Sequence, residues 1–114
     1  SSLLLALMAS GLNGQSFAFH GYLPIQNDER SKTIRALEKE SAQLQRTQLF
    51  IETPYRNEAM FTTLLNICQA NTLLCVAREL ATANEMVVTR SIRDWKKQAP
   101  PDLARCPTVF LLLA

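Results

Sequence analysis

Apolar and polar residues alternate along the chain with periods typical of both helices and strands. An apolar run over residues 3–10 stops at Gly11, which predicts a short buried helix with a glycine stop signal. Residues 17–22 hold three aromatic side chains in weak alternation and read as a strand. Over residues 27–45 a narrow apolar stripe follows helical spacing, so we expect this helix to lie on one face of a sheet. The stripe consists of Ile34, Leu37, Ser41 and Leu44.

Residues that cap helices mark most of the predicted helix ends. Asn27 offers a capping side chain at the start of the long helix. Thr53 is a good N-cap, and Pro54 suits the first position of the helix that runs to about residue 69. Asn71 can supply a left-handed stop after that helix, and Ser91 caps a short helix over residues 92–97.

The remaining segments predict a mixed sheet. The run 72–77 is continuously apolar, as expected for a strand buried on both faces. Three further strands are expected over residues 47–51, 86–89 and 107–113. The element order is helix, strand, helix, strand, helix, strand, strand, helix, strand. This order favours an α/β fold, a three-layer α/β/α sandwich with a mixed sheet.

Composition narrows the function classes without choosing one. The chain has 114 residues, 47% of them hydrophobic and 19% charged, which suits one globular domain with a real core. The net charge of +2 is too small to indicate nucleic-acid binding by itself. The apolar start is too short to span a bilayer, so no membrane partner is expected. Both ends of the chain begin or stop inside an apolar pattern, so we expect them to be cut from a longer protein.

The cysteines and the single histidine give no metal site. Cys68 and Cys75 lie in apolar surroundings, and neither they nor Cys106 form a C-x-x-C pair. We expect free thiols and a cytoplasmic location. His20, on an aromatic strand, is interpreted as a structural residue, and no Gly-rich phosphate loop is present.

Polar residues directly follow two strands of the predicted sheet. The block Glu-Thr-Pro-Tyr-Arg at 52–56 comes after strand 47–51, and segment 78–85 comes after strand 72–77. Ligands of open α/β sheets bind outside the carboxyl ends of strands, so both segments are candidate binding loops. The alternative is purely structural: the acid and base of residues 52–56 pair across one helical turn, and segment 78–85 is a solvated loop.

These two segments resemble motifs of a known enzyme family. Residues 52–56 resemble the Glu-Ser/Ala-Pro-x-Arg block of the tetrapyrrole (corrin/porphyrin) methylase superfamily. Residues 77–80 with Glu85 are similar to the Ala-Arg-Glu-Leu segment of its branch that contains the small-subunit ribosomal RNA ribose-2′-O-methyltransferase. Residues 1–12, 19–24 and 107–109 resemble further segments of that branch in the same order, so the resemblance covers essentially the whole chain.

The resemblance implies an S-adenosylmethionine-dependent methyltransferase built from two α/β domains, with the cofactor in the cleft between them. Residues 1–13 would be the hinge helix from the preceding domain, and residues 14–114 the C-terminal α/β methylase domain. The missing N-terminal domain is then the partner of this chain, ribosomal RNA is the expected substrate, and a homodimer is allowed. No catalytic residue is assigned, and the reaction requires no metal, because it mainly needs donor and acceptor to be positioned.

Under this hypothesis the site residues are those at the strand ends. Arg56 and Arg78 are expected to meet an anionic acceptor such as an RNA backbone, with ion pairs to Glu52 and Glu79 as the alternative. The expected cofactor-binding residues are Ile51, Glu52, Ala77, Leu80, Ala81 and Pro107.

Two other functions stay open. A tetrapyrrole or other small-molecule methylase would keep the cofactor and change the acceptor. A non-enzymatic α/β module for ligand sensing or oligomerisation would need a self-contained sheet and polar termini.

Overall fold

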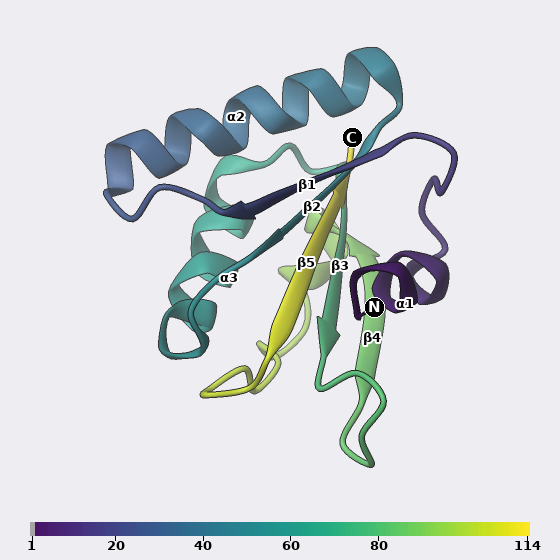
Figure 1. Ribbon diagram of the computed structural model, residues 1–114. Helices are drawn as coiled ribbons and strands as arrows, with labels where there is room; N and C mark the ends of the chain where they lie inside the picture. Colours follow the sequence, from purple (N-terminus) through teal and green to yellow (C-terminus); the bar gives the residue numbers. More distant parts are fainter. Residues whose placement is uncertain (1) are drawn as a thin grey trace.

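Five strands form a mixed sheet in the order β1-β2-β5-β3-β4 in the computed structural model, which describes residues 2–114 (Figure 1). The strands are β1 (Phe17–Tyr22), β2 (Thr47–Ile51), β3 (Leu73–Arg78), β4 (Met86–Ser91) and β5 (Thr108–Leu113). The helices are α1 (Ser2–Ser10), α2 (Asn27–Leu44), α3 (Asn57–Ile67) and α4 (Ile92–Trp95), with a 3-10 turn η1 (Pro54–Arg56) before α3. The predicted element order and the mixed sheet are confirmed.

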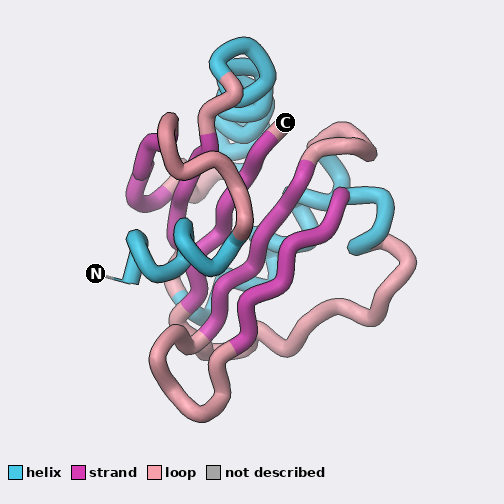
Figure 2. The backbone as a smooth tube through the Cα atoms, turned by 90° about the vertical axis from the view of Figure 1, so that its right-hand side faces the viewer, coloured by secondary structure: helices cyan, strands magenta, loops and turns pink. Residues whose placement is uncertain are grey.

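The sheet lies between two layers of helices of unequal size. On one face α2, α3 and α4 bury a core in which the rings of Phe50 and Phe110 stack with centroids 5.8 Å apart. On the other face α1 is the one described helix, and its Ala6 and Leu7 share a hydrophobic core with Ala77. Figure 2 shows α1 by itself in front of the strands. The three-layer architecture is therefore present, with one layer reduced to a single helix.

The strand directions place the carboxyl ends of β1, β2 and β3 at one edge of the sheet. β1 pairs with β2 in parallel, whereas β5 is antiparallel to both β2 and β3. β1, β2 and β3 therefore share one direction, and their carboxyl ends meet at the same edge of the sheet. β4 runs antiparallel to β3, so β4 and β5 begin at this edge. The central strands β2, β3 and β5 are almost fully buried.

The helix-end predictions have mixed outcomes. Gly11 has a left-handed φ of 73°, and the Ser91 hydroxyl accepts a hydrogen bond from the Asp94 amide at 3.1 Å, as expected. Asn27 is not the N-cap of α2: that position is Gln26, and the Asn27 side chain instead accepts from Arg30. Asn71 is not left-handed, because α3 ends at the extended residue Cys68.

Two further details of the predicted helices are wrong. Leu44 is 51% exposed, although Ser41 in the same last turn of α2 is fully buried. Thr53 takes the N-cap position and Pro54 the first helical position as predicted, but in the 3-10 turn η1 rather than in an α-helix, and the Thr53 side chain makes no capping bond. The Thr53 hydroxyl is used instead in contacts with Glu52 and Arg56.

Candidate functional site

The loops that leave β1, β2 and β3 gather at the shared edge of the sheet with the start of β5. The backbone N–H of Glu79, just after β3, donates to the carbonyl of Pro107, just before β5, at 2.9 Å. The Asn57 side chain at the start of α3 donates to the carbonyl of Cys106 at 2.7 Å. These bonds fix the entry of β5 between the two segments that the sequence singled out.

A cavity of about 370 Å³ lies at this edge, and we call it the strand-end pocket. Five of the six residues predicted to bind a cofactor line it, namely Ile51, Glu52, Ala77, Leu80 and Pro107. Its other lining residues are Ser2, Tyr22, Pro54, Glu79, Thr82, Thr108 and Val109. The volume lies in the range of small-molecule sites. The sequence thus predicted residues that the fold brings together from three strand ends.

The walls of the strand-end pocket are mainly apolar. Ile51, Ala77 and Val109 sit next to one another in the register of β2, β5 and β3. They belong to the core that lies under α1. An apolar wall with a few polar groups is the usual design of a small-molecule or cofactor site.

The loop after β3 has an unusual backbone. Glu79 and Ala81 have φ angles of 51° and 63°, in the left-handed region that non-glycine residues seldom adopt. The Ala81 amide donates to the Glu85 carboxylate at 2.8 Å, so its N–H is already used inside the loop. Ala81 does not line the pocket, and its predicted contact with the cofactor stays a prediction. Strained backbone of this kind is concentrated at ligand-binding loops.

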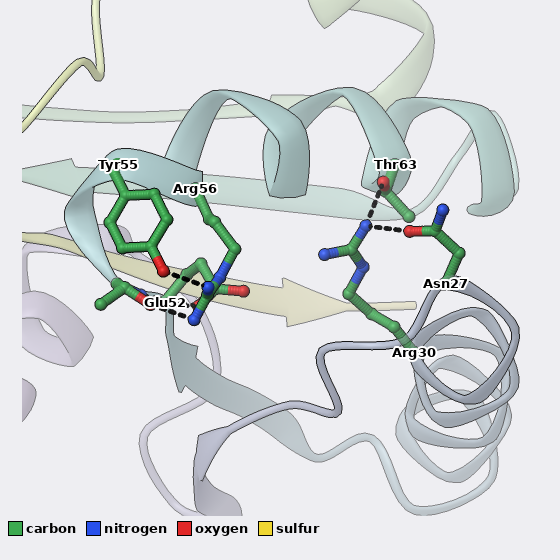
Figure 3. A network of polar contacts seen from close by, with 7 residues as sticks. Asn27, Arg30, Glu52, Tyr55, Arg56 and Thr63 are labelled. Atoms are coloured by element: carbon green, nitrogen blue, oxygen red, sulfur yellow. Dashed lines mark hydrogen bonds and ion pairs between the residues drawn. The ribbon is translucent and has the colours of Figure 1, made fainter.

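Glu52 is the centre of a polar cluster beside the pocket (Figure 3). Its side chain is 1% exposed. One carboxylate oxygen, Oε1, accepts from the Thr53 amide at 2.7 Å, from the Thr53 hydroxyl at 3.0 Å and from Arg56 Nε at 3.3 Å. The sequence predicted the acid and base of this block but not that the acid would be buried.

Both arginines predicted to meet the substrate are engaged within the chain. Arg56 also donates to the Thr53 hydroxyl at 2.5 Å and to the Tyr55 hydroxyl, and its guanidinium lies 4.7 Å from the centre of the Tyr55 ring. Arg78 lies 3.9 Å from the Glu79 carboxylate and donates to the Asp102 carbonyl at 2.5 Å. The structural alternative, ion pairs with Glu52 and Glu79, is therefore observed, and substrate contact by the two arginines stays a prediction.

A second cavity of about 960 Å³ adjoins the first, and we call it the outer pocket. It lies between the start of α2 and the block after β2. Its lining residues are Tyr22, Leu23, Pro24, Ile25, Gln26, Glu29, Glu52, Thr53 and Arg56. Tyr22 and Glu52 line both cavities. Tyr22 was not predicted as a site residue, although it lies inside the segment 19–24 that carried part of the resemblance.

Neither a metal centre nor a membrane span is found in the described part of the chain. Within residues 2–114, no three His, Cys, Asp or Glu side chains are grouped so that they could hold a metal ion. No helix in the same range is long and apolar enough to cross a membrane. All three cysteines are free thiols, and Cys68 and Cys75 are buried as expected.

The fold and the strand-end pocket define an α/β domain with a cavity at the carboxyl edge of its sheet. The crystal structure of the methyltransferase CobJ aligns with 97% of this chain at a TM-score of 0.65 and 19% identity, covering 46% of that chain. This likeness shows the fold. A scan against known protein families finds no match.

Relatives found by sequence identify the family, whereas the structural neighbour shows only the fold. The ribosomal RNA small subunit methyltransferase I of Buchnera aphidicola subsp. Baizongia pistaciae is 31% identical over 96 residues, 82% of this chain. The enzyme of the same name from Bacillus subtilis is 33% identical over 91 residues, 80% of this chain. The chain belongs to the tetrapyrrole methylase family, with ribosomal RNA small subunit methyltransferase I as its homologues. It spans about a third of the length of these curated relatives.

Proposed function

We propose that this chain is the C-terminal α/β domain of an S-adenosylmethionine-dependent methyltransferase that acts on the ribose 2′-oxygen of ribosomal RNA. The observation that carries the proposal is the strand-end pocket, which collects four apolar residues expected to bind the cofactor, Ile51, Ala77, Leu80 and Pro107. The names of the relatives support the class of reaction and the ribosomal RNA substrate. Because the relatives are about three times as long, the remaining wall of the site is assigned to another part of the same polypeptide.

The residues present fit the cofactor. Ile51, Ala77 and Leu80 offer an apolar surface for the adenosine part, and Pro107 closes the pocket at the start of β5. The bound cofactor would supply an activated methyl group for an in-line displacement, a reaction that needs alignment and exclusion of water more than it needs a catalytic side chain. The contribution of this chain is therefore to position the cofactor and to shape its pocket. A cytoplasmic location goes with the proposal and rests on the three free thiols.

Isothermal titration of the full-length protein with S-adenosylmethionine tests the cofactor assignment. We expect one site, and we expect Ala77→Trp to weaken binding by tenfold or more, because Ala77 is 1% exposed and the indole would fill the pocket. Ala70→Trp is the matched control, since Ala70 is exposed and lies at the opposite edge of the sheet. Thermal melting of both variants separates a blocked pocket from a damaged fold. Normal binding by a folded Ala77→Trp variant would refute this placement.

The acceptor needs its own experiment. Incubation of the full-length protein with methyl-labelled cofactor and small ribosomal subunits should place the label on ribosomal RNA. Absence of label on the RNA, with cofactor binding intact, would remove ribosomal RNA as the substrate. Tetrapyrroles would then be tested as acceptors in the same assay.

A further inference from the structure

The second oxygen of the Glu52 carboxylate, Oε2, has no hydrogen-bond partner among the described residues, although it is buried. Oε1 takes all three donors of the local cluster (Figure 3). A buried carboxylate oxygen without a donor costs free energy, and unpartnered groups of this kind are uncommon in native proteins. Arg56 directs three of its N–H groups to Glu52 Oε1, Thr53 and Tyr55, and within residues 2–114 no donor reaches Oε2.

Glu52 also occupies a special place between the two cavities. It lines the strand-end pocket and the outer pocket, and Tyr22 is the other residue that they share. A methyl donor in the strand-end pocket would therefore face whatever enters the outer pocket across Glu52 and Tyr22. The two adjoining cavities are therefore placed as a methyl donor and a methyl acceptor would need to be.

The charges of the outer pocket narrow the chemistry of its ligand. Its charged lining residues are Glu29, Glu52 and Arg56, so carboxylates outnumber cations. Arg56 is bound to Glu52, which leaves no free cation in the described lining for a phosphate. The exposed ring of Tyr22, 65% accessible, offers a flat apolar surface at the rim. These features suit an uncharged group that carries O–H or N–H donors and a flat face, as the nucleoside part of an RNA substrate does.

We propose that the outer pocket binds the nucleoside that receives the methyl group, and that Glu52 Oε2 positions it by accepting a hydrogen bond from one of its O–H or N–H groups. This inference rests on the proposed function and goes beyond it, because it assigns Glu52 to the acceptor rather than to the cofactor. Arg56 is then a positioning residue that acts through Glu52, because it holds Oε1 and leaves Oε2 for the substrate.

The test is the Glu52→Gln variant of the full-length protein, which keeps the shape of the side chain and replaces the carboxylate with an amide. The matched control is Glu38→Gln, because Glu38 is also a buried carboxylate but receives its donors from Gln69 and Thr72 away from both cavities. Three quantities are measured: thermal melting, binding of S-adenosylhomocysteine, and kcat/KM for methylation of small ribosomal subunits.

We expect Glu52→Gln to bind S-adenosylhomocysteine within threefold of the parent and to lose about 10- to 100-fold in kcat/KM for the RNA, the loss typical of one hydrogen bond to a charged group. Glu38→Gln should keep kcat/KM within threefold. Equal kcat/KM in the two variants would overturn the inference, and so would a loss of cofactor binding in Glu52→Gln that matches the loss of activity. If Glu52→Gln does not fold, Glu52→Asp keeps the charge beside Arg56 and should show the same selective loss.

The two levels of the proposal fail differently. If the parent protein does not bind S-adenosylhomocysteine, the proposed function fails. If it binds the cofactor and methylates RNA but Glu52→Gln is unaffected, the inference about the outer pocket alone fails.

Discussion

The backbone N–H of Glu79 donates to the carbonyl of Pro107 at 2.9 Å, which ties the loop after β3 to the entry of β5. Both residues line the strand-end pocket. The bond holds Glu79 with a φ of 51°, and two residues later Ala81 has a φ of 63°. One wall of the proposed cofactor site is therefore a loop kept in a conformation that its residues do not favour by themselves.

The first prediction concerns this strain. A left-handed φ costs a residue with a Cβ roughly 1–2 kcal/mol, and glycine avoids most of that cost while losing some backbone entropy on folding. Ala81→Gly should therefore leave the free energy of unfolding unchanged or raise it by up to about 1 kcal/mol. Ala81→Val should lower it by about 1–2 kcal/mol, because a β-branched side chain fits this region worst. Chemical denaturation of the two variants measures the difference.

Ala83 provides the control for the same loop. It is exposed and does not have a positive φ. Ala83→Gly should lower the free energy of unfolding slightly, and Ala83→Val should change it little. If glycine and valine have the same effects at residues 81 and 83, the left-handed backbone at Ala81 is not a source of strain.

The strand-end pocket could be predicted in large part because it depends on a rule about sheets. A continuously apolar run such as Leu73–Val76 indicates a strand buried on both faces, and the residues after such strands meet at one edge. This identified Ile51 and Ala77. The resemblance added Pro107, whose place depends on β5 lying between β2 and β3, a pairing that local sequence does not encode.

The misses have physical causes. Tyr22 lines both pockets at the place where the register of β1 against β2 shifts, between Phe19 and Tyr22 and next to Gly21 with its φ of 65°. Such an irregularity cannot be predicted from a weak alternation of apolar and polar residues. Leu44 fits the apolar spacing of α2 but is exposed, because the spacing does not show which positions of the stripe the sheet covers. The sequence could not predict that Glu52 Oε2 lacks a hydrogen-bond partner. This depends on the folded geometry, in which all the local donors point to Oε1.

The second prediction concerns stability at alkaline pH. Burial raises the pKa of the Cys68 thiol from its usual 9.0 to about 12, and the neighbouring Glu38 carboxylate adds to the rise. The folded protein thus keeps this thiol protonated where the unfolded chain has lost the proton. The stability contributed by Cys68 is fully present below pH 9 and is lost as the pH rises toward 12.

Cys68→Ala isolates this contribution. The difference in free energy of unfolding between parent and variant should be constant below pH 9. Above it, the difference should shrink by up to about 1.4 kcal/mol per pH unit, the limit for one proton. Urea denaturation at a series of pH values gives the two curves. Parallel curves up to pH 11 would show that the Cys68 pKa is not raised in the folded protein.

The third prediction tests the buried carboxylate on the far side from the pockets. Glu38 Oε2 accepts hydrogen bonds from the backbone N–H of Gln69 at 2.8 Å and from the Thr72 hydroxyl at 2.5 Å. These bonds join α2 to the turn between α3 and β3. Thr72→Val keeps the shape of the side chain and removes the hydroxyl, so the buried Glu38 carboxylate loses one of its donors. We expect a loss of about 1.5–3 kcal/mol in the free energy of unfolding, as for hydrogen bonds to charged groups.

Thr72→Ser separates the hydroxyl from the methyl group. It should retain most of the stability, because serine can donate to Glu38 in the same way and only a small apolar contact is lost. Binding of S-adenosylhomocysteine to the full-length protein should be the same in both variants, since Thr72 precedes β3 and the strand-end pocket lies past its other end. A Thr72→Val variant as stable as Thr72→Ser would show that this hydrogen bond does not help to hold α2 against the sheet.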